Sequence, residues 1–361
     1  MATLRDVARR ASVSTSTVSH VVNGTRSVSE TLRRRVLAAA QDLDYEPNAM
    51  ARSLRMRRSN TLGLIISDLA NPYFTAVVHG VEDAAQENGY GLILCNSSED
   101  IAREQAYLRV LSSRQVDGLI LSPVGNQHEL LARMVREGFP LVLFDRDVPG
   151  LDVSGVMLDN ERAAFDAVHH LTALGHSRIG MVSGLPNTAS TNTERIAGYR
   201  RALEEAGLPE DSRLIVPGHA TSEGAASAVA ELLAVTPRPT AIFAANNLMT
   251  IGALFAIQQA GLSVPKDIAL VGFDDFSWSE VFRPRLTTVA QPTYELGRVT
   301  AELLLNLVRS DHAEPTRRII LRGQLIVRES SGAALESQNP RTLRDPVRAR
   351  SVRQGAQRPG R

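Results

Sequence analysis

Apolar residues in the first fifty positions recur at helical spacing in three short segments, each with one apolar face. Thr3 and Asp6 have the spacing of a capping box at the start of the first segment, and Ser14 and Ser29 precede the other two. Three such helices can enclose a small core. The apolar faces consist of Leu4, Val7, Ala8 and Ala11, then Val18, Val21 and Val22, then Leu32, Val36, Ala40 and Leu43.

The second of these segments, residues 15–22, carries hydrogen-bonding side chains opposite its apolar face. These side chains belong to Thr15, Ser16, Ser19 and His20. Two short helices joined by a tight turn, with the second helix polar on its outer face, are typical of a helix-turn-helix that enters the major groove of DNA. We therefore predict a small all-α helix-turn-helix domain over residues 1–46.

Charge is concentrated at this end of the chain. Residues 1–60 contain eleven arginines and five acidic residues, whereas the whole chain has a net charge of only +1. A basic surface of this kind is expected where a protein meets DNA phosphates. The alternative, a helical bundle with a solvated basic face, does not account for the combination of capping, periodicity and charge. Residues 47–59 follow as a predicted hinge, too short to be helical without DNA or a partner.

From residue 61 the pattern changes to short apolar strands that alternate with helical stretches. Continuous apolar strands in such an alternation predict parallel sheets covered on both faces. Two successive series predict an α/β module of two doubly wound parallel-sheet lobes, with a ligand cleft at the carboxyl ends of the strands. The predicted strands are 62–67, 91–95, 118–121 and 141–145 in the first series, and 179–183, 214–216, 241–244 and 268–273 in the second.

Composition narrows the function further. A single cysteine, Cys95, excludes an internal disulfide framework and fits a reducing cytoplasm. No apolar run of about eighteen residues occurs, and the N-terminus is charged, so we expect neither a membrane span nor export. Residues 331–361 contain seven arginines and two acids without an apolar period, which predicts a disordered, solvated tail. Additional nonspecific affinity for DNA is the alternative role of the tail.

Over residues 2 to about 330 the chain resembles the LacI/GalR family of bacterial transcriptional regulators. The matching motifs are LRDVA at 4–8, VSTSTVSHVVNG at 13–24 and PNAMARSL at 47–54. The resemblance implies that Thr15, Ser16 and His20 read the major groove and that Asn23 contacts phosphate. It also implies that Leu54 is a wedge in the minor groove, with Arg52 and Ser53 on the DNA backbone.

The two lobes resemble the effector module of that family and the periplasmic sugar-binding proteins. By this resemblance residues 60–330 bind the ligand and dimerise, with one lobe of about 60–160 and 291–322 and another of about 161–290 and 323–330. Most of the implied site residues lie at strand ends or on the loops that follow. The implied effector-binding residues are Asn71, Tyr73, Phe74, Asp145, Arg146, Arg195, Asn246, Asp274 and Gln291.

The chemistry of this set suits a monosaccharide. Planar bidentate groups match adjacent hydroxyls that both donate and accept, and an aromatic pair can cover the C–H face of a sugar. Alternatives are open for individual residues: Asp145 and Asp274 as helix caps, Arg195 as a surface ion-pairing residue, and Phe74 as core.

Three positions depart from the family or distinguish its branches. Asn247 stands where many members carry aspartate. His219 is a loose candidate for the ring that often stacks from the opposite lobe. Arg146 stands where the purine-binding branch has tryptophan, which favours a sugar over a nucleobase.

The leading prediction is a cytoplasmic, nucleoid-associated, homodimeric repressor that a monosaccharide such as ribose releases from a palindromic operator. A purine- or sugar-phosphate-responsive regulator with co-repression is the first alternative, and a sugar-binding receptor is the second. The tail has no leucine heptads, so a dimer is expected rather than a tetramer. No dinucleotide or phosphate-loop motif, metal-ligand spacing or nucleophile elbow occurs, so we expect no enzyme, no cofactor and no metal.

Overall fold

A computed structural model describes residues 2–23, 26–45, 59–113, 116–125, 129–184, 190–310, 312 and 314–332. Three helices form the N-terminal head: α1 (Leu4–Arg10), α2 (Thr15–Asn23) and α3 (Glu30–Asp42). The capping box at Thr3 is confirmed, because the Asp6 carboxylate accepts from the Thr3 amide at 2.9 Å and the Thr3 hydroxyl accepts from the Asp6 amide at 3.4 Å. The Ser14 hydroxyl accepts from the Thr17 amide at 3.1 Å and so caps α2.

The head has its own hydrophobic core, separate from those of the lobes. Leu32 and Ala40, predicted for the core face of α3, are half-buried, whereas Ala39 is fully inside. The helix is therefore rotated slightly from the face that the spacing predicts. The packing of α1 and α3 against α2 leaves the outer face of α2 open to solvent. The buried residues of this core are Val7, Ala8, Ala11, Val18, Val21, Val36 and Ala39.

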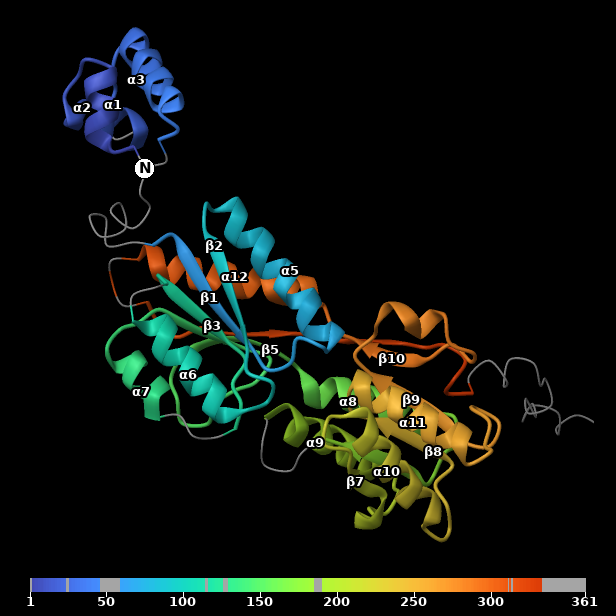
Figure 1. The fold of residues 1–361 in the computed structure, drawn as a ribbon. Helices are drawn as coiled ribbons and strands as arrows, with labels where there is room; N and C mark the ends of the chain where they lie inside the picture. The colour runs from blue at the N-terminus through green and yellow to red at the C-terminus, as the bar shows by residue number, and fades with distance from the viewer. Residues whose placement is uncertain are drawn as a thin grey trace, which may run out of the picture.

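The described residues between 59 and 332 form two α/β lobes that lie side by side (Figure 1). Each contains a six-stranded sheet, in the order β11-β5-β4-β3-β1-β2 for lobe 1 and β12-β10-β9-β8-β6-β7 for lobe 2. All pairs are parallel except β10 with β12, and the predicted fold class is confirmed. The strands are β1 (Thr61–Ile66), β2 (Gly91–Asn96), β3 (Gly118–Leu121), β4 (Leu141–Phe144), β5 (Ser154–Leu158), β6 (Ile179–Ser183), β7 (Ile215–Pro217), β8 (Ala241–Ala244), β9 (Ala269–Phe273), β10 (Thr287–Ala290), β11 (Arg318–Leu321) and β12 (Gln324–Ile326).

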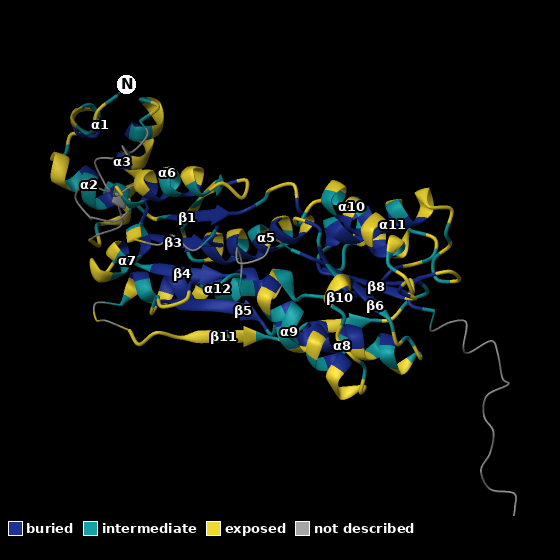
Figure 2. Cartoon of the chain, turned by 90° about the horizontal axis from the view of Figure 1, so that it is seen from below, coloured by how far each residue is buried: buried dark blue, intermediate teal, exposed yellow. Residues whose placement is uncertain are grey.

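Helices cover both faces of the sheets, whose inner strands are buried (Figure 2). Each lobe has its strand order reversed beside its first strand, β1 or β6, which is where a doubly wound sheet opens a ligand crevice. The helices are α5 (Pro72–Glu87), α6 (Ile101–Ser112), α7 (Glu129–Arg136), α8 (Asn160–Ala173), α9 (Ser190–Glu205), α10 (Ser222–Ala234), α11 (Asn247–Gln259) and α12 (Thr293–Arg309), with 3₁₀ turns η1 (Ser212–Leu214) and η2 (Ser277–Glu280).

The chain crosses between the lobes three times: from β5 to α8, from β10 to α12, and from β11 to β12. The eight predicted strands are all present within a residue at each end, but β5, β10, β11 and β12 were not anticipated. β10 escaped notice because two of its buried residues, Thr287 and Thr288, are polar. The folded chain also extends past residue 330, where the tail was expected to begin, since Ser331 is fully buried and hydrogen-bonded to His170.

Glycines set the closest approach of the helices that pack in pairs. A methyl group added at Gly297 of α12 would lie 2.2 Å from the Val77 carbonyl oxygen of α5. In the other pairs, a methyl group added at Gly198 of α9 would lie equally close to the backbone of α8. One added at Gly252 of α11 would lie equally close to the backbone of α10. Backbone atoms cannot yield as a flexible side chain can, so each position requires the absence of a side chain.

We therefore predict that Gly297→Ala destabilises the protein by about 1–3 kcal/mol, because α12 must move away from α5. Urea unfolding followed by circular dichroism measures the change. Asn306→Ala, at an exposed position of the same helix, is the control and should stay within about 0.5 kcal/mol of the wild type. Equal stability of the two variants would show that the helices can separate at no cost.

Candidate ligand-binding cleft and DNA-binding surface

A cleft of about 380 Å³ lies between the lobes, within the size range of small-molecule sites. It is lined by loops at the carboxyl ends of strands from both sheets. The structure brings all nine predicted effector-binding residues into its lining, although their part in binding remains a prediction. From lobe 1 and its connections come Asn71, Tyr73, Phe74, Asp145, Arg146 and Gln291, and from lobe 2 come Arg195, Asn246 and Asp274.

Two buried carboxylates occupy matching places in the two lobes. Asp145 follows β4 and Asp274 follows β9, both in the left-handed backbone region, at φ 65° and 67°. Neither caps a helix, so the capping alternative is wrong for both. Asp145 accepts from Ser122 Oγ at 3.4 Å, and Asp274 accepts from Gln291 Nε2 at 2.5 Å. Burial raises the pKa of both carboxyls, against the lowering effect of nearby arginines that include Arg195.

Arg195 extends from α9 between these carboxylates and is only 8% exposed, which rules out a surface ion pair. Its Nε donates to Asn160 Oδ1 at 2.9 Å and its Nη1 donates to the Ala245 carbonyl at 2.5 Å. The guanidinium also lies 3.8 Å from the ring centre of Phe273, within the range of a cation–π contact. A planar cation is thus held in one orientation in the cleft before any ligand arrives.

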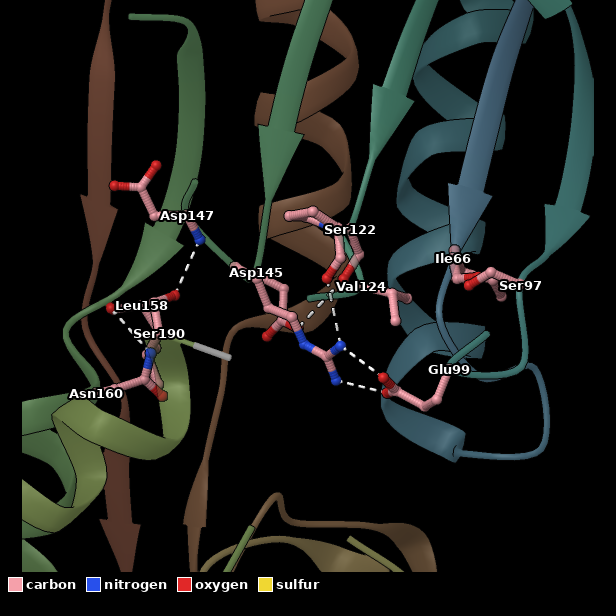
Figure 3. A network of polar contacts seen from close by, with 12 residues as sticks. Ile66, Ser97, Glu99, Ser122, Val124, Asp145, Asp147, Leu158, Asn160 and Ser190 are labelled. Carbon is pink, nitrogen blue, oxygen red and sulfur yellow. Dashed lines mark hydrogen bonds and ion pairs between the residues drawn. The ribbon is translucent and has the colours of Figure 1, made fainter. Parts of the chain in front are cut away.

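Arg146 forms the charged wall of lobe 1. It donates to both oxygens of Glu99 at 2.8 and 2.6 Å and to the Pro123 carbonyl at 3.3 Å. Its Nε lies 3.5 Å from Asp145 Oδ2 and makes no hydrogen bond. Figure 3 shows Glu99, Ser122 and Asp145 near one another at the ends of the lobe 1 strands. The bidentate pair leaves the Nε edge directed toward the Asp145 carboxylate.

Aromatic rings line the lobe 1 side. Tyr73 and Phe74 meet edge to face at 5.0 Å, and Phe74 continues against Phe144 at 6.1 Å. Phe74 is thus both core and lining, because it packs in the lobe 1 core and also faces the cleft. The Tyr73 hydroxyl is buried without a hydrogen-bond partner, and burial raises its pKa.

The two asparagines predicted for the site also start helices. Asn71 Oδ1 accepts from the Tyr73 amide at 2.9 Å, and Asn246 Oδ1 accepts from the Met249 amide at 2.7 Å. These are N-cap bonds, so each carbonyl oxygen already accepts one hydrogen bond, and Asn71 Oδ1 accepts a second from Asn247. The two amide nitrogens and the second lone pair of Asn246 Oδ1 are what these asparagines can still offer a ligand.

Besides the contact of Gln291 with Asp274, two further hydrogen bonds join described residues of the two lobes. Asn247 Nδ2 donates to Asn71 Oδ1 at 2.7 Å, and the Asp147 amide donates to Ser190 Oγ at 2.9 Å. Asn247 stands where the family resemblance implies an aspartate. Its side chain provides an N–H that a carboxylate lacks, and its Oδ1 still accepts from the Leu248 amide at 2.7 Å.

Buried polar atoms without partners are concentrated at the cleft. Among the described side chains they are Tyr73 Oη, Arg146 Nε, Gln291 Oε1 and Ser67 Oγ, and the first three belong to cleft-lining residues. Leaving such a group unsatisfied costs about 1–3 kcal/mol. Buried donors and acceptors that have no partner favour a ligand rich in hydroxyl or amide groups.

Several lining residues were missed by the sequence analysis. Thr191 and Asn192 precede Arg195 by four and three positions on α9, a spacing that could have revealed them. Glu99 could not have been found, because only the folded sheet places it beside Arg146. The other unanticipated lining residues are Asp68, Ser98, Gly184, Ala220, Thr221, Ala245, Leu248 and Met249.

On the head, the structure places Thr15 and Ser16 on the exposed face of α2 and leaves His20 half-buried there. Asn23 ends α2, and its side chain is outside the described part of the structure, as are Arg52, Ser53 and Leu54. Within the described residues no group of three or more side chains could hold a metal ion, and no helix is long and apolar enough to cross a membrane.

A helix-turn-helix head joined to a two-lobed module with a polar interlobe cleft defines a ligand-responsive DNA-binding regulator. Comparison with protein families agrees: residues 3–48 match bacterial regulatory proteins of the lacI family, and residues 59–328 match the periplasmic binding proteins and sugar-binding domain of the LacI family. The chain belongs to the LacI family and is an effector-controlled, DNA-binding transcriptional repressor.

Similar proteins cover nearly the whole chain. It is 38% identical to the HTH-type transcriptional repressor PurR of Photobacterium profundum, over 91% of this chain and 98% of that protein. It is 37% identical to the ribose operon repressor of Haemophilus influenzae over the same shares. Among solved structures, the lac repressor dimer bound to operator and the anti-inducer ONPF superposes with a TM-score of 0.82 at 28% identity, over 91% of this chain and 99% of that one.

Below the cleft wall lies a carboxylate that the site does not use directly. Glu104 of α6 is 1% exposed, and its Oε2 accepts from the Val124 amide at 2.6 Å. Burial raises the pKa of Glu104 to about 7, although the Val124 amide and Arg146 both favour the charged form and Glu99 opposes it. The folded protein therefore holds this proton more tightly than the unfolded chain does.

Because this pKa is raised in the folded state, the stability gained by protonation is present at low pH and is lost as pH rises from about 4.5 to about 7. Glu104→Gln stays neutral and can still accept from Val124. We predict that its free energy of unfolding exceeds that of the wild type by up to about 3 kcal/mol at pH 8, and that the gap shrinks toward pH 5. Denaturant unfolding at both values measures this. Parallel pH curves for the two proteins would contradict it, and exposed Glu82→Gln is the control.

Proposed function

We propose that this repressor binds a neutral monosaccharide, with ribose as the first candidate, and that the sugar releases it from a palindromic operator. The observation that carries the proposal is the pairing of Asp145 and Asp274, one from each lobe, around the fixed guanidinium of Arg195. Such groups match the vicinal hydroxyls of a sugar, and a ligand that contacts both carboxylates necessarily bridges the lobes.

The charge of the lining favours a neutral ligand over a phosphorylated one. With all carboxylates ionised, the acidic side chains exceed the guanidinium groups by two, and Glu99 already pairs with Arg146. A phosphate dianion would add to this excess rather than offset it. The charged lining residues are Asp68, Glu99, Asp145 and Asp274, with Arg146 and Arg195.

The purine alternative has support of a different kind, since relatives named PurR match this chain as closely as the ribose operon repressor does. Sequence identity therefore does not choose between the two ligands. The lining itself favours a sugar, because its described lobe 2 residues include no aromatic ring apart from the imidazole of His219. A nucleobase would have Tyr73 and Phe74 on one side and no large ring opposite.

A homodimer is the proposed assembly, because two heads are needed to read a palindrome with useful affinity. Exposed apolar side chains on both lobes support contact with a second copy of the chain. They include Ile93 and Leu94 on the edge strand β2, and Phe255, Trp278 and Val281 on lobe 2.

At the operator, Thr15, Ser16 and His20 are proposed to read bases and Asn23 to contact phosphate. Arg52, Ser53 and Leu54 are proposed for the minor groove. We propose no catalytic step, and a site of action in the bacterial cytoplasm at the nucleoid.

Calorimetry of the full-length protein tests the ligand. We predict that ribose binds and that Asp145→Asn and Asp274→Asn each weaken binding by about 10- to 100-fold, since each removes a charged hydrogen-bond acceptor. Asp152→Asn, at an exposed position of lobe 1, should leave binding unchanged. Hypoxanthine and ribose 5-phosphate are the competing ligands. Binding of either one without ribose would replace the sugar proposal.

A DNA duplex selected from a random library by the wild-type protein tests the head. We predict that Thr15→Ala lowers affinity for the selected duplex by about tenfold, because one base contact is worth about 1–3 kcal/mol. Affinity for an unrelated duplex should not change, because phosphate contacts dominate there. Gln41→Ala, exposed on α3, is the matched control. Equal losses on both duplexes would assign Thr15 to the DNA backbone.

A further inference from the structure

A carboxylate at the end of the lobe 1 sheet remote from the cleft has no part in the proposed functions. Asp117 directly precedes β3, and its Oδ1 accepts from the Ser59 amide at 2.6 Å and from Ser59 Oγ at 2.9 Å. Its Oδ2 accepts from the Asn60 amide at 2.8 Å. The Asp117 amide itself donates to the Thr61 carbonyl at 2.8 Å. One residue thus holds the point where the chain from the head enters lobe 1.

The strand that follows Asp117 leads straight to the cleft. At its far end Ser122 Oγ donates to Asp145 at 3.4 Å, and the Pro123 carbonyl accepts from Arg146 at 3.3 Å. Between these ends β3 is fully buried and is paired on both sides, with β1 and β4. Its four residues span about 13 Å. A buried, doubly paired strand of this length cannot bend without breaking its ladder, so its two ends move together.

We propose that Asp117 is the residue that couples the cleft to the DNA-binding part of the chain. Rearrangement of Asp145 and Arg146 on ligand binding moves the carboxyl end of β3, and Asp117 transfers that movement to Ser59 and Asn60. The coupling rests on the proposed effector control. The hydrogen bonds of Asp117 with residues 59 and 60 do not depend on that proposal. Asp117 is not among the residues that line the cleft, so its role in this proposal is that of a positioning residue.

Two other features sharpen the assignment. Asn60 has a left-handed backbone, at φ 49°, which is uncommon for a residue other than glycine and is held here by its hydrogen bonds. Its carbonyl also accepts from the Gly91 amide at 2.9 Å, so the entry point is tied to the start of β2 as well as to β3. Without the carboxylate of Asp117, the amides of Ser59 and Asn60 lose the acceptors that orient them.

The experiment compares Asp117→Asn with the wild type as full-length proteins, with exposed Asp152→Asn as the charge-matched control. Asparagine keeps one acceptor oxygen but presents an NH₂ group to one of the two amides. Three quantities are measured: ribose affinity by calorimetry, affinity for the library-selected duplex with and without ribose, and hydrogen exchange of peptides that cover residues 59–66.

We expect Asp117→Asn to bind ribose within about twofold of the wild type, yet to lose about tenfold in affinity for the selected duplex and most of its response to ribose, a change within the usual range of coupling between sites. Hydrogen exchange at residues 59 and 60 should accelerate, with no change for peptides that line the cleft. Asp152→Asn should match the wild type in all three measurements.

Unchanged DNA affinity and unchanged ribose response in Asp117→Asn would overturn the proposal. A parallel loss of ribose affinity would overturn it too, since Asp117 would then support the lobe as a whole. If the wild-type protein shows no response to ribose, the sugar assignment fails separately, and DNA affinity with hydrogen exchange still decides the role of Asp117. In that case a loss of DNA affinity in Asp117→Asn, without a loss in Asp152→Asn, supports the role of Asp117. Unchanged DNA affinity in Asp117→Asn refutes it.

Discussion

Buried charge is the constraint around which this molecule is arranged. The cleft holds more carboxylates than guanidinium groups, and a charge removed from water is tolerated only with partners in fixed geometry. Arg195 meets that requirement through Asn160, Ala245 and the ring of Phe273. Each contact comes from a different part of the fold, so the position of one cation depends on α8, the residue that follows β8, and β9 together.

The two lobes have the same topology and hold a buried carboxylate at the same point in it. Each places an aspartate after the fourth strand of its series, in a left-handed turn that directs the carboxylate into the cleft. The two carboxylates differ in what faces them: Arg146 and its partner Glu99 face Asp145, whereas Gln291, from the segment that connects back to lobe 1, faces Asp274. A ligand between the lobes would meet Asp145 and Arg146 on one side and Asp274 and Arg195 on the other, so both walls of the cleft carry charged groups.

The sequence was informative where structure is local and much less so where contacts are long-range. Capping at Thr3 and Ser14 and eight strands follow from spacing and apolar runs, since those features are encoded within a few positions. The nine residues expected in the cleft came instead from the resemblance to the LacI/GalR family, and the fold brings all nine into the lining. Glu99, Glu104 and Asp117 escaped because their partners lie 20 to 58 residues away, and acidic residues at ordinary helix or loop positions carry no local signal. The edge strands β11 and β12 were missed because they are short and partly exposed.

The hydrogen bond between Asn247 and Asn71 joins the lobes through two uncharged groups. A contact of this kind neither titrates nor is screened by salt, unlike the ion pairs elsewhere on the protein. This hydrogen bond between the lobes therefore does not depend on acidity or ionic strength. The carboxylates around it do, because burial raises the pKa of Asp145, Asp274 and Glu104. A change in the medium thus acts on the surroundings of this contact and on the basic head, but not on the contact itself.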